Sequence, residues 1–388
     1  MHGSSEGVGL ENGEDPSLNG NALVLYADAS LLLKTTKMCD IIAPKQSVSF
    51  SISDTAMTVR AGKSLMIEAT IPVRLENSSD HLPLTFEAST RFTAVIPEDG
   101  TRCEFRFCFV RAESAPSSAQ TFIGTVADLK IRWPYKTTNA PPVSCDELRD
   151  AKPVAPSEIA KAVMMARPFA TDKDTTAPTS SIGILGAIAK ASTSIGRRSV
   201  TSDKLSGLEM TITRPDSKAI AEALRQFDPL STQFCKMGQT QIFFDDAFRL
   251  RIPRADKDVP WLEEPFEAYQ EFQFDDQALS ESLSWILSQK PKHHGMGGPI
   301  DIRSDDTAQN LIFSYALDNG RAVVECPCTS KHVVDGIHLL VGYSNLSKLS
   351  GFAGSSTSLE ICPSSIRFNE TANDFSVCTE IAAARSAS

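Results

Sequence analysis

Cysteine and histidine residues cluster in the C-terminal third of the sequence and raise the question of a metal site. Cys326 and Cys328 are two residues apart, His332 follows shortly after them, and a His-His pair occupies positions 293–294. Zinc prefers thiolate and imidazole ligands, but structural zinc sites usually combine two Cys-x-x-Cys or His-x-x-x-His elements. The sequence offers no second element at a usual interval. We therefore interpret the cysteines as buried thiols at strand ends and expect no metal site.

Other patterns that can support catalysis are equally weak. Asp245-Asp246 and Asp305-Asp306 are pairs of carboxylates, but their neighbours are typical of turns, where acidic residues are usually solvated. The segment 295–298 reads GMGG and precedes an expected strand instead of a helix, so it does not indicate a phosphate-binding loop. Gly-x-Ser-x-Gly, His-Glu-x-x-His and Walker patterns do not occur in the sequence. We expect a protein that is not an enzyme and uses no cofactor.

The composition is that of a globular protein with several cores. The 388 residues are 41% apolar and 22% charged, and no apolar run is long enough for a spanning helix. The first 20 residues lack the apolar region of a signal peptide, so we expect a disordered N-terminal tail and a cytoplasmic protein. Nine cysteines, mostly in apolar stretches, fit a reducing compartment. The net charge of −10 argues against indiscriminate nucleic-acid binding but allows a local basic surface.

Two kinds of amphipathic segment, which would have to position any functional residue, recur three times along the chain. Leu31, Ile159 and Leu279 lie in the first kind, at intervals of 128 and 120 positions, and the second kind recurs at 129 and 127 positions. Each segment is followed by alternating stretches that predict strands. The expected helices are 30–42, 157–170 and 276–288 for the first kind, and 89–96, 216–227 and 344–352 for the second.

The repeat predicts an α+β fold of three similar domains, in which two helices pack on antiparallel sheets. We expect the tail at 1–20 and domains at 21–140, 141–265 and 266–388. Asp28, Ser157 and either Asp275 or Asp276 are the expected N-caps of the first helices. Pro215 suits the first turn of the helix that follows it. Asp318-Asn319-Gly320 predicts a hairpin turn.

Several stretches within this repeat resemble a known family. They are LLLKTTKMCDII near the N-terminus, RRSVTSDKLSGLEMTI and RPDSKAIAEALRQFDP in the middle, and FSVCTEI near the C-terminus. Over about residues 22–385 the chain resembles the bacterial DNA polymerase III beta sliding clamp. The resemblance implies a homodimeric ring around duplex DNA, with helices lining the hole and sheets outside. It also implies a processivity factor that an ATP-driven loader opens and that tethers polymerase and other DNA-processing proteins through linear peptide motifs.

A sliding ring needs sequence-independent attraction to phosphates, which Lys and Arg provide. The alternative for each such residue is an ordinary solvated helix face, and acidic Asp275, Asp276 and Glu281 beside the third domain's first helix weaken the case there. The expected DNA-binding residues, hereafter the basic set, lie on the candidate lining helices or in nearby loops: Lys34, Lys37, Lys45, Arg60, Lys63, Arg91, Lys161, Arg167, Lys173, Lys218, Arg225, Lys290 and Lys348.

The family's peptide pocket lies between its second and third domains. Matched position by position, the expected peptide-pocket residues, hereafter the peptide set, are Thr193, Gly196, Arg197, Val200, Pro215, Ile220, Val377 and Cys378. The chain departs from the family in both motifs. Residues 193–198 read Thr-Ser-Ile-Gly-Arg-Arg where the family usually has Thr-Asp-Gly-His-Arg-Leu, and residues 378–381 read Cys-Thr-Glu-Ile where it often has Met-Pro-Met-Arg. Ordinary sheet and core residues are the alternative interpretation.

Two other functions remain open at this point. A divergent accessory or phage-type clamp with its own clients would explain the unusual last strand. A structural β-rich protein that does not bind DNA would use the repeat only to build mass.

Overall fold

The computed structural model describes most of the chain. The described residues are 22–76, 82–97, 103–110, 120–138, 148, 150–171, 178–193, 196–255, 270–274, 277–289, 298–305, 307, 309–317, 319–330, 337–349, 356–362, 364–372 and 374–385. No helix in this described part is both long and apolar enough to cross a membrane.

The chain divides into two compact units. Unit 1 comprises residues 1–156 and 222–253, and unit 2 comprises residues 157–221 and 254–388. The division passes through the expected second domain at residue 221, within a helix. The three domain boundaries stay a prediction.

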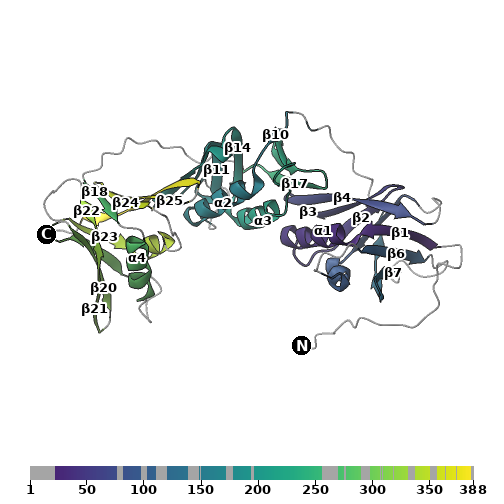
Figure 1. The fold of residues 1–388 in the computed structure, drawn as a ribbon, viewed down its shortest axis with the longest axis horizontal. Coiled ribbons are helices and arrows are strands. Elements are labelled where there is room, and N and C mark those ends of the chain that lie inside the picture. The colour runs from purple at the N-terminus through teal and green to yellow at the C-terminus, as the bar shows by residue number, and fades with distance from the viewer. Residues whose placement is uncertain are drawn as a thin grey trace. The chain divides into compact units, whose positions relative to one another are not determined.

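Unit 1 contains one sheet of 13 antiparallel strands. On its face, α1 (Ala29–Ile42) packs against β3 and β4, with Leu32, Met38 and Cys39 buried (Figure 1). The strand bounds are β1 (Ala22–Asp28), β2 (Val48–Ile52), β3 (Ala56–Gly62), β4 (Met66–Leu75), β5 (Leu84–Ala88), β6 (Glu104–Val110), β7 (Thr121–Val126), β8 (Leu129–Pro134), β9 (Lys136–Thr137), β10 (Lys152–Pro153), β15 (Gln233–Met237), β16 (Thr240–Phe244) and β17 (Phe248–Pro253).

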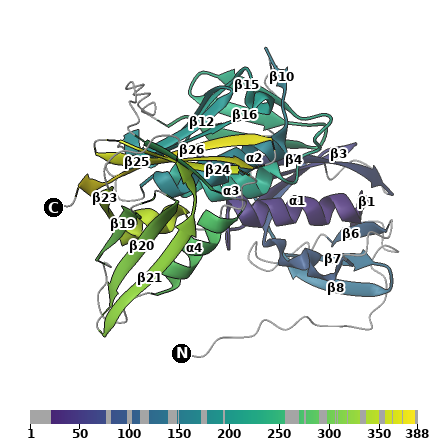
Figure 2. The same cartoon turned by 60° about the vertical axis from the view of Figure 1, so that its left-hand side comes forward.

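Unit 2 contains a sheet of nine strands and a sheet of five. The first runs β14 (Leu208–Thr213), β11 (Ser181–Gly186), β12 (Ile188–Thr193), β13 (Gly196–Thr201), β26 (Phe375–Ala382), β25 (Ser365–Ala372), β24 (Ser356–Ile361), β18 (Gln270–Phe274), β22 (Thr329–Ser330). The second runs β21 (Gly320–Pro327), β20 (Asn310–Leu317), β19 (Pro299–Ser304), β23 (His338–Gly342), β27 (Ala384–Arg385). Figure 2 shows β20 and β21 as a long hairpin with α4 (Ala278–Ser288) beside it.

Apart from the two-residue strands β9, β22 and β27, the order of elements repeats three times: one strand, one helix, four strands, a second helix and three strands. Strand pairing follows the same repeat. The third strand after the first helix of one repeat pairs with the last long strand of the next repeat, as β4 does with β17 and β13 does with β26. The equivalent strands β21 and β8 lie at the ends of their sheets, each with one neighbour among the described strands.

Proline residues explain where two helices differ from the sequence prediction. The predicted helix 89–96 is a short 3₁₀ helix, η2 (Thr90–Val95), because Pro97 forces the preceding Ile96 into an extended conformation. The predicted helix 157–170 is α-helical only as α2 (Pro156–Ala166). It continues as the 3₁₀ turn η4 (Arg167–Phe169), since Pro168 has no N–H to donate. Ser157 therefore lies inside the first turn and is not the N-cap.

The other helices agree with the prediction to differing degrees. The predicted helix 216–227 is α3 (Arg214–Leu224), with Pro215 in its first turn as expected. The predicted helix 344–352 is a short α5 (Tyr343–Leu346) followed by the 3₁₀ turn η7 (Ser347–Leu349), and 350–352 lie outside the described residues. The Ser347 hydroxyl donates to the Ser344 carbonyl, a local bond of the kind that competes with helix continuation.

Local capping and turn predictions can be checked at three places. Asp28 is confirmed as the N-cap of α1, because its carboxylate accepts from the Leu31 N–H at 2.7 Å. Asp275 and Asp276 lie outside the described residues, and Gln277 precedes α4. The hairpin is confirmed by the pairing of Leu317 with Gly320. The other short 3₁₀ turns are η5 (Pro178–Ser180) and η6 (Asp203–Leu205).

Candidate functional site

The basic set divides into exposed and half-buried side chains. Lys45 and Lys63 lie in turns, as expected, and Lys173 and Lys290 lie outside the described residues. The exposed members are Lys37 on α1, Arg91 on η2, Lys161 on α2, Lys218 on α3, Arg225 just after α3, and the two turn lysines. Within the described residues, the exposed helical cations therefore come from the first two repeats. The solvated side of α4 carries Glu281 and Trp285 instead.

Four members of the basic set are half-buried against the protein itself, and the exposed Lys161 pairs with Glu158 at 2.9 Å. The Lys34 ammonium lies 4.9 Å from the centre of the Phe248 ring. The Arg167 Nε donates to the Ser217 hydroxyl at 3.1 Å. Lys348 is half-buried, as is Arg60. Half-buried charges are less available to a phosphate backbone than the exposed ones.

The location of Arg60 differs from the sequence prediction. It was expected in a loop, but it lies within β3, directly opposite Glu68 on β4. Met57, Val59 and Ala61 alternate toward the core, so Arg60 points to the other face. There its guanidinium pairs with the buried Glu68 carboxylate.

The peptide set is brought together mainly by one pair of strands. Gly196, Arg197 and Val200 on β13 lie opposite Ile381, Glu380 and Val377 on β26, and Cys378 pairs with Ser199. The Thr193 hydroxyl at the end of β12 donates to the carbonyl of Gly196, the first residue of β13, at 3.1 Å. Pro215 and Ile220 lie on α3.

Because side chains alternate along a strand, the peptide-set residues on β13 and β26 lie on two opposite faces of the sheet. Val200 and Val377 are 0% and 1% exposed and face the core, as does Ile220 on its helix. Arg197 and Cys378 lie on the opposite side of the sheet, which faces solvent. Neighbouring side chains cover the Cys378 thiol there, and this burial raises its pKa. Val200, Ile220 and Val377 are therefore core residues in this structure, whereas Pro215 is exposed, and the solvent-facing member on β13 is charged.

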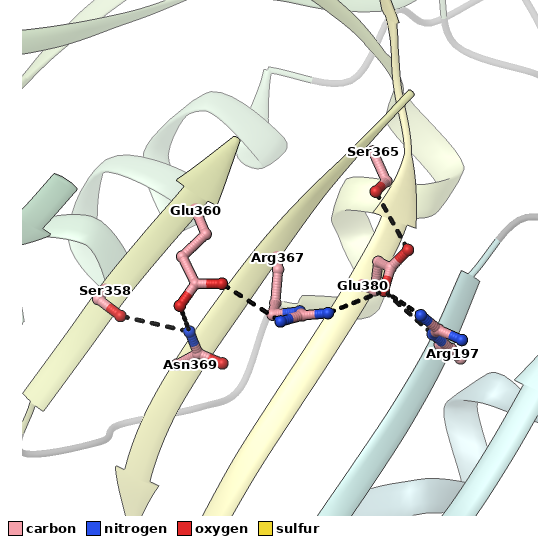
Figure 3. Close-up of polar contacts among 7 residues, drawn as sticks. All are labelled: Arg197, Ser358, Glu360, Ser365, Arg367, Asn369 and Glu380. Atoms are coloured by element: carbon pink, nitrogen blue, oxygen red, sulfur yellow. Dashed lines mark hydrogen bonds and ion pairs between the residues drawn. The ribbon is translucent and has the colours of Figure 1, made fainter. Parts of the chain in front are cut away.

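A ladder of polar side chains covers that solvent-facing side across four strands (Figure 3). Arg197 donates to Glu380 Oε2 from Nε at 3.0 Å and from a terminal nitrogen at 2.8 Å. Arg367 lies between Glu380 and Glu360, at 3.6 and 3.4 Å. Asn369 donates to Glu360 at 2.8 Å, and the Ser365 hydroxyl donates to Glu380 at 3.1 Å. Ser358 completes the ladder, in which two arginines and two glutamates neutralise one another.

The opposite face of the same strands holds a buried arginine. Arg198 is 1% exposed, and its guanidinium stacks 4.6 Å from the centre of the Phe169 ring. It donates to the Thr379 hydroxyl at 2.7 Å, the Met165 carbonyl at 3.0 Å and the Lys348 carbonyl at 3.2 Å. Burial lowers the pKa of Arg198 to about 10. The side chain joins β13, β26, the end of α2 and η7 at a single point.

Glu370 is the carboxylate whose charge acts on Arg198. Burial raises the pKa of Glu370 to about 7, although the Arg198 charge acts in the opposite direction. The Oε2 atom is buried and has no hydrogen-bond partner among the described residues. Near neutral pH this side chain is therefore divided between its neutral and charged forms.

Gly196 is required by a close approach of two strands. A Cβ at this position would lie 2.7 Å from the Glu380 carbonyl oxygen and 3.1 Å from a carbon of the Phe169 ring. We expect Gly196→Ala to lower the free energy of unfolding by about 1–3 kcal/mol, in the range of overpacked cores. Urea denaturation measures this loss. Gly298→Ala is the control, because a Cβ there meets nothing within 4 Å, and an equal loss in both variants would contradict the explanation.

The cysteine pair shows the chemistry of buried thiols. Cys326 and Cys328 are 0% and 8% exposed. Burial raises the pKa of both, that of Cys328 to about 12, so neither is a ready thiolate ligand. His332 and the pair at 293–294 lie outside the described residues. Within the described part of the chain, no group of three or more metal-ligating side chains is present.

Solved structures of similar fold are known, although no protein-family model and no curated protein sequence matches this chain. The DNA polymerase III subunit beta of Pseudomonas aeruginosa matches with a TM-score of 0.72 at 12% identity, covering 94% of this chain and 100% of that one. The beta sliding clamp of C. crescentus matches at 0.74 and 11%, covering 95% and 100%. The DNA polymerase beta subunit of Streptococcus pyogenes matches at 0.71 and 11%, covering 94% and 100%.

These matches confirm the predicted fold class, an α+β arrangement of helices on antiparallel sheets. More narrowly, the chain has the fold of the bacterial DNA polymerase III beta sliding clamps. The similarity extends over nearly the whole of both chains.

Proposed function

We propose that this protein is a DNA sliding clamp, a processivity factor that encircles duplex DNA without catalysing a reaction. Two copies would close a ring built from the three predicted domains of each chain. The ring would bind DNA of any sequence, be opened by a loader, and tether a polymerase and other DNA-processing proteins through short peptides in the cytoplasm. The clamp fold supports this proposal. The main observation in its favour is the pairing of strands between successive repeats.

The strand pairing leaves two complementary edges. Joins of one type, β4 with β17 and β13 with β26, link successive repeats within the chain. If the same type of pairing continued from one copy to the next, β21 of one copy would pair with β8 of another. Both strands lie at the edges of their sheets. Their solvent-facing side chains are complementary, since Glu325 on β21 would approach Lys130 and Arg132 on β8. Val323 on β21 and Leu129 on β8 are 47% and 49% exposed and would be covered.

Two such joins between copies would close a ring. Isologous use of the same two edges by both partners gives a closed dimer with twofold symmetry. The alternative function, a structural β-rich protein that does not bind DNA, requires neither a closed ring nor basic side chains on the helices. The exposed cations on α1, η2, α2 and α3 favour the DNA-binding role.

Retention on circular DNA tests the proposal directly. Loaded onto a nicked circular plasmid by a bacterial clamp loader, the protein should stay bound through gel filtration and dissociate when the plasmid is linearised. A topological link predicts this difference, because a ring slides off a free end. Equal retention on both forms, or none on either while a standard clamp is retained, would contradict encirclement.

Charge reversal tests which side chains attract the DNA. We expect Lys37→Glu with Lys218→Glu to lower loading onto circular DNA at least about ten-fold at low salt, because phosphate attraction is lost along the helices. Lys136→Glu with Lys152→Glu is the matched control, since these exposed lysines lie on strands β9 and β10. Loading is measured by DNA pull-down across a salt series. Equal loss in the two variants would show that only net charge matters.

The polar ladder favours a clamp with its own clients as the second candidate. An apolar peptide anchor would meet Arg197 and Glu380 on the solvent-facing side of β13 and β26. Substitution for the standard clamp in a reconstituted bacterial replication assay separates the two: full activity there would reject the accessory role.

A further inference from the structure

One buried carboxylate holds three basic side chains on the five-stranded sheet of unit 2. Asp301 on β19 is 4% exposed. Its Oδ2 atom accepts from a terminal nitrogen of Arg303 and from a terminal nitrogen of Arg321, both at 2.8 Å. Arg303 also donates from Nε at 3.1 Å, and the His338 Nε2 atom lies 2.8 Å from Oδ1. Because the two guanidinium groups share one oxygen atom, they are held side by side despite their like charges.

The pairing of the strands explains why these side chains meet. The isoleucines before and after Asp301 are fully buried in the core, so Asp301 and Arg303 point to the other face of the sheet. Arg303 pairs with His338 on the neighbouring strand β23. Arg321 comes from β21, two strands away, and reaches Asp301 across β20. The residue of β20 that pairs with Asp301 is Ser314, whose small side chain leaves the path open.

This face of the sheet is turned away from the neighbouring helix. α4 packs against β20 and β21, and Ser282 on α4 hydrogen-bonds to the thiol of Cys326. Cys326 and Arg321 are five positions apart on β21, so their side chains lie on opposite faces. The cations proposed to attract DNA lie on helices. The Asp301 cluster therefore lies apart from the helical side of the sheet.

The two guanidinium groups share a single carboxylate. Within the described part of the chain, Asp301 is the one carboxylate within ion-pair distance of Arg303 or Arg321. Their side chains are 46% and 52% exposed, so N–H donors that point away from Asp301 face solvent. Asp305 accepts hydrogen bonds within its own turn, and Glu325 lies two strands from Arg303, a separation of about 10 Å. One positive charge of the pair is therefore left without a carboxylate in contact.

We propose that Arg303 and Arg321 together bind the phosphate group of a phosphorylated side chain on a partner protein. A guanidinium presents planar pairs of N–H donors that match phosphate oxygens. Two such groups side by side suit a phosphate monoester, which carries nearly two negative charges. The Asp301 carboxylate fixes both arginines before binding and so lowers the entropic cost of ordering them. Because the pair is half exposed on the face of a sheet, it is accessible to a phosphate carried on the surface of another protein.

Phosphopeptide binding tests the proposal. The probe is a labelled polyalanine heptapeptide with phosphoserine at its centre, acetylated and amidated, and its counterparts carry Ser or Glu there. Fluorescence anisotropy with the full chain at low salt should find the phosphoserine peptide bound about ten-fold more tightly than the Glu peptide, with the Ser peptide weakest. Equal binding of the phosphoserine and Glu peptides, including no binding at millimolar concentration, overturns the proposal. So does inorganic phosphate that competes as strongly as the phosphopeptide, which would assign the site to a free anion.

Variants then assign the binding to the guanidinium pair. Arg303→Met and Arg321→Met should each lower the affinity for the phosphoserine peptide about ten-fold and leave the Ser peptide unchanged. Each variant keeps one arginine beside Asp301, so the buried carboxylate stays paired. Arg74→Met is the matched control, because this arginine is 60% exposed and pairs with Glu104 at 2.7 Å, and it should leave the affinity unchanged. A phosphoserine preference that survives both substitutions overturns the proposal.

The result does not depend on the encirclement of DNA. The whole cluster lies on one sheet of unit 2, so a chain that is not retained on circular DNA can still show the phosphoserine preference. Arg303→Met should leave retention on circular DNA unchanged, since the exposed helical lysines remain. A ten-fold loss of binding to a short DNA duplex in Arg303→Met would place this arginine on a DNA surface and overturn the phosphopeptide proposal.

Discussion

A variant carrying Val323→Lys and Glu325→Lys should run as a monomer of 42.0 kDa in light scattering at micromolar concentration, where we expect the wild-type chain to run at twice that mass. The two new positive charges on β21 would face Lys130 and Arg132 on β8 of the other copy. Like charges placed opposite one another across strands are destabilising. The change also removes the apolar area of Val323, which is 47% exposed in the isolated chain. The same variant should lose retention on circular DNA completely, because an open ring is not topologically linked.

A charge swap provides the control. A second variant, Lys130→Glu with Arg132→Glu, should also be monomeric by itself, because its new negative charges would face Glu325 of the other copy. When the two variants are mixed in equal amounts, the lysines on β21 of the first should pair with the glutamates on β8 of the second, and the two should form a heterodimer. A wild-type monomer, or two charge variants that remain dimers, would show that β8 and β21 do not form the interface.

Glu370→Gln should raise the free energy of unfolding at pH 8 and leave it nearly unchanged at pH 5. Burial raises the pKa of Glu370 from its ordinary value of 4.5 to about 7. The folded state therefore holds this proton more tightly than the unfolded state, and stability falls as pH rises from 4.5 through 7. At about 1.4 kcal/mol per pKa unit, the gain from a permanently neutral side chain is about 2–3 kcal/mol at pH 8.

Urea denaturation at several pH values measures the difference between the two proteins. The expected curves diverge above pH 5 and run parallel above about pH 8. Glu360→Gln is the comparison within the same sheet, because Glu360 accepts from Asn369 at 2.8 Å and pairs with Arg367. Its removal should destabilise. A Glu370→Gln variant less stable than wild type at pH 8 would mean that Arg198 depends on the charged carboxylate.

The fold could be predicted from the sequence wherever periodicity and turn chemistry agreed. The threefold recurrence of amphipathic segments, the Asp28 cap and the hairpin before Gly320 were all visible in single residues. Helix ends were less visible, because Pro97 and Pro168 act through backbone geometry that a hydrophobic pattern does not weigh. The division of the chain at residue 221 had no signal in composition.

The candidate site was only partly visible. Position-by-position matching placed Gly196, Arg197 and Val377 on strands that do adjoin. It missed Arg198 and Glu370, since a charged residue in a strand is ordinarily taken to face water. The signal that was missed is the alternation of side chains along the strand. Arg198 is two residues before Val200, so both side chains lie on the same face of β13, the one that packs on the core. Arg60 and Lys348 show the reverse case, in which a residue that appeared free contacts a neighbour: Arg60 pairs with Glu68 on the next strand, and Lys348 lies over Phe169 from a distant segment.

The repetition of one strand junction has a mechanical consequence for an assembled ring. Joins made inside a chain are held by covalent connection, so dilution leaves them intact, whereas the proposed β21–β8 join between two chains would depend on protein concentration. Of the three kinds of seam around such a torus, only that one obeys mass action. An opening force applied anywhere on the circumference would therefore part the ring there first, and a tandem fusion of two chains across that seam would leave a single gate.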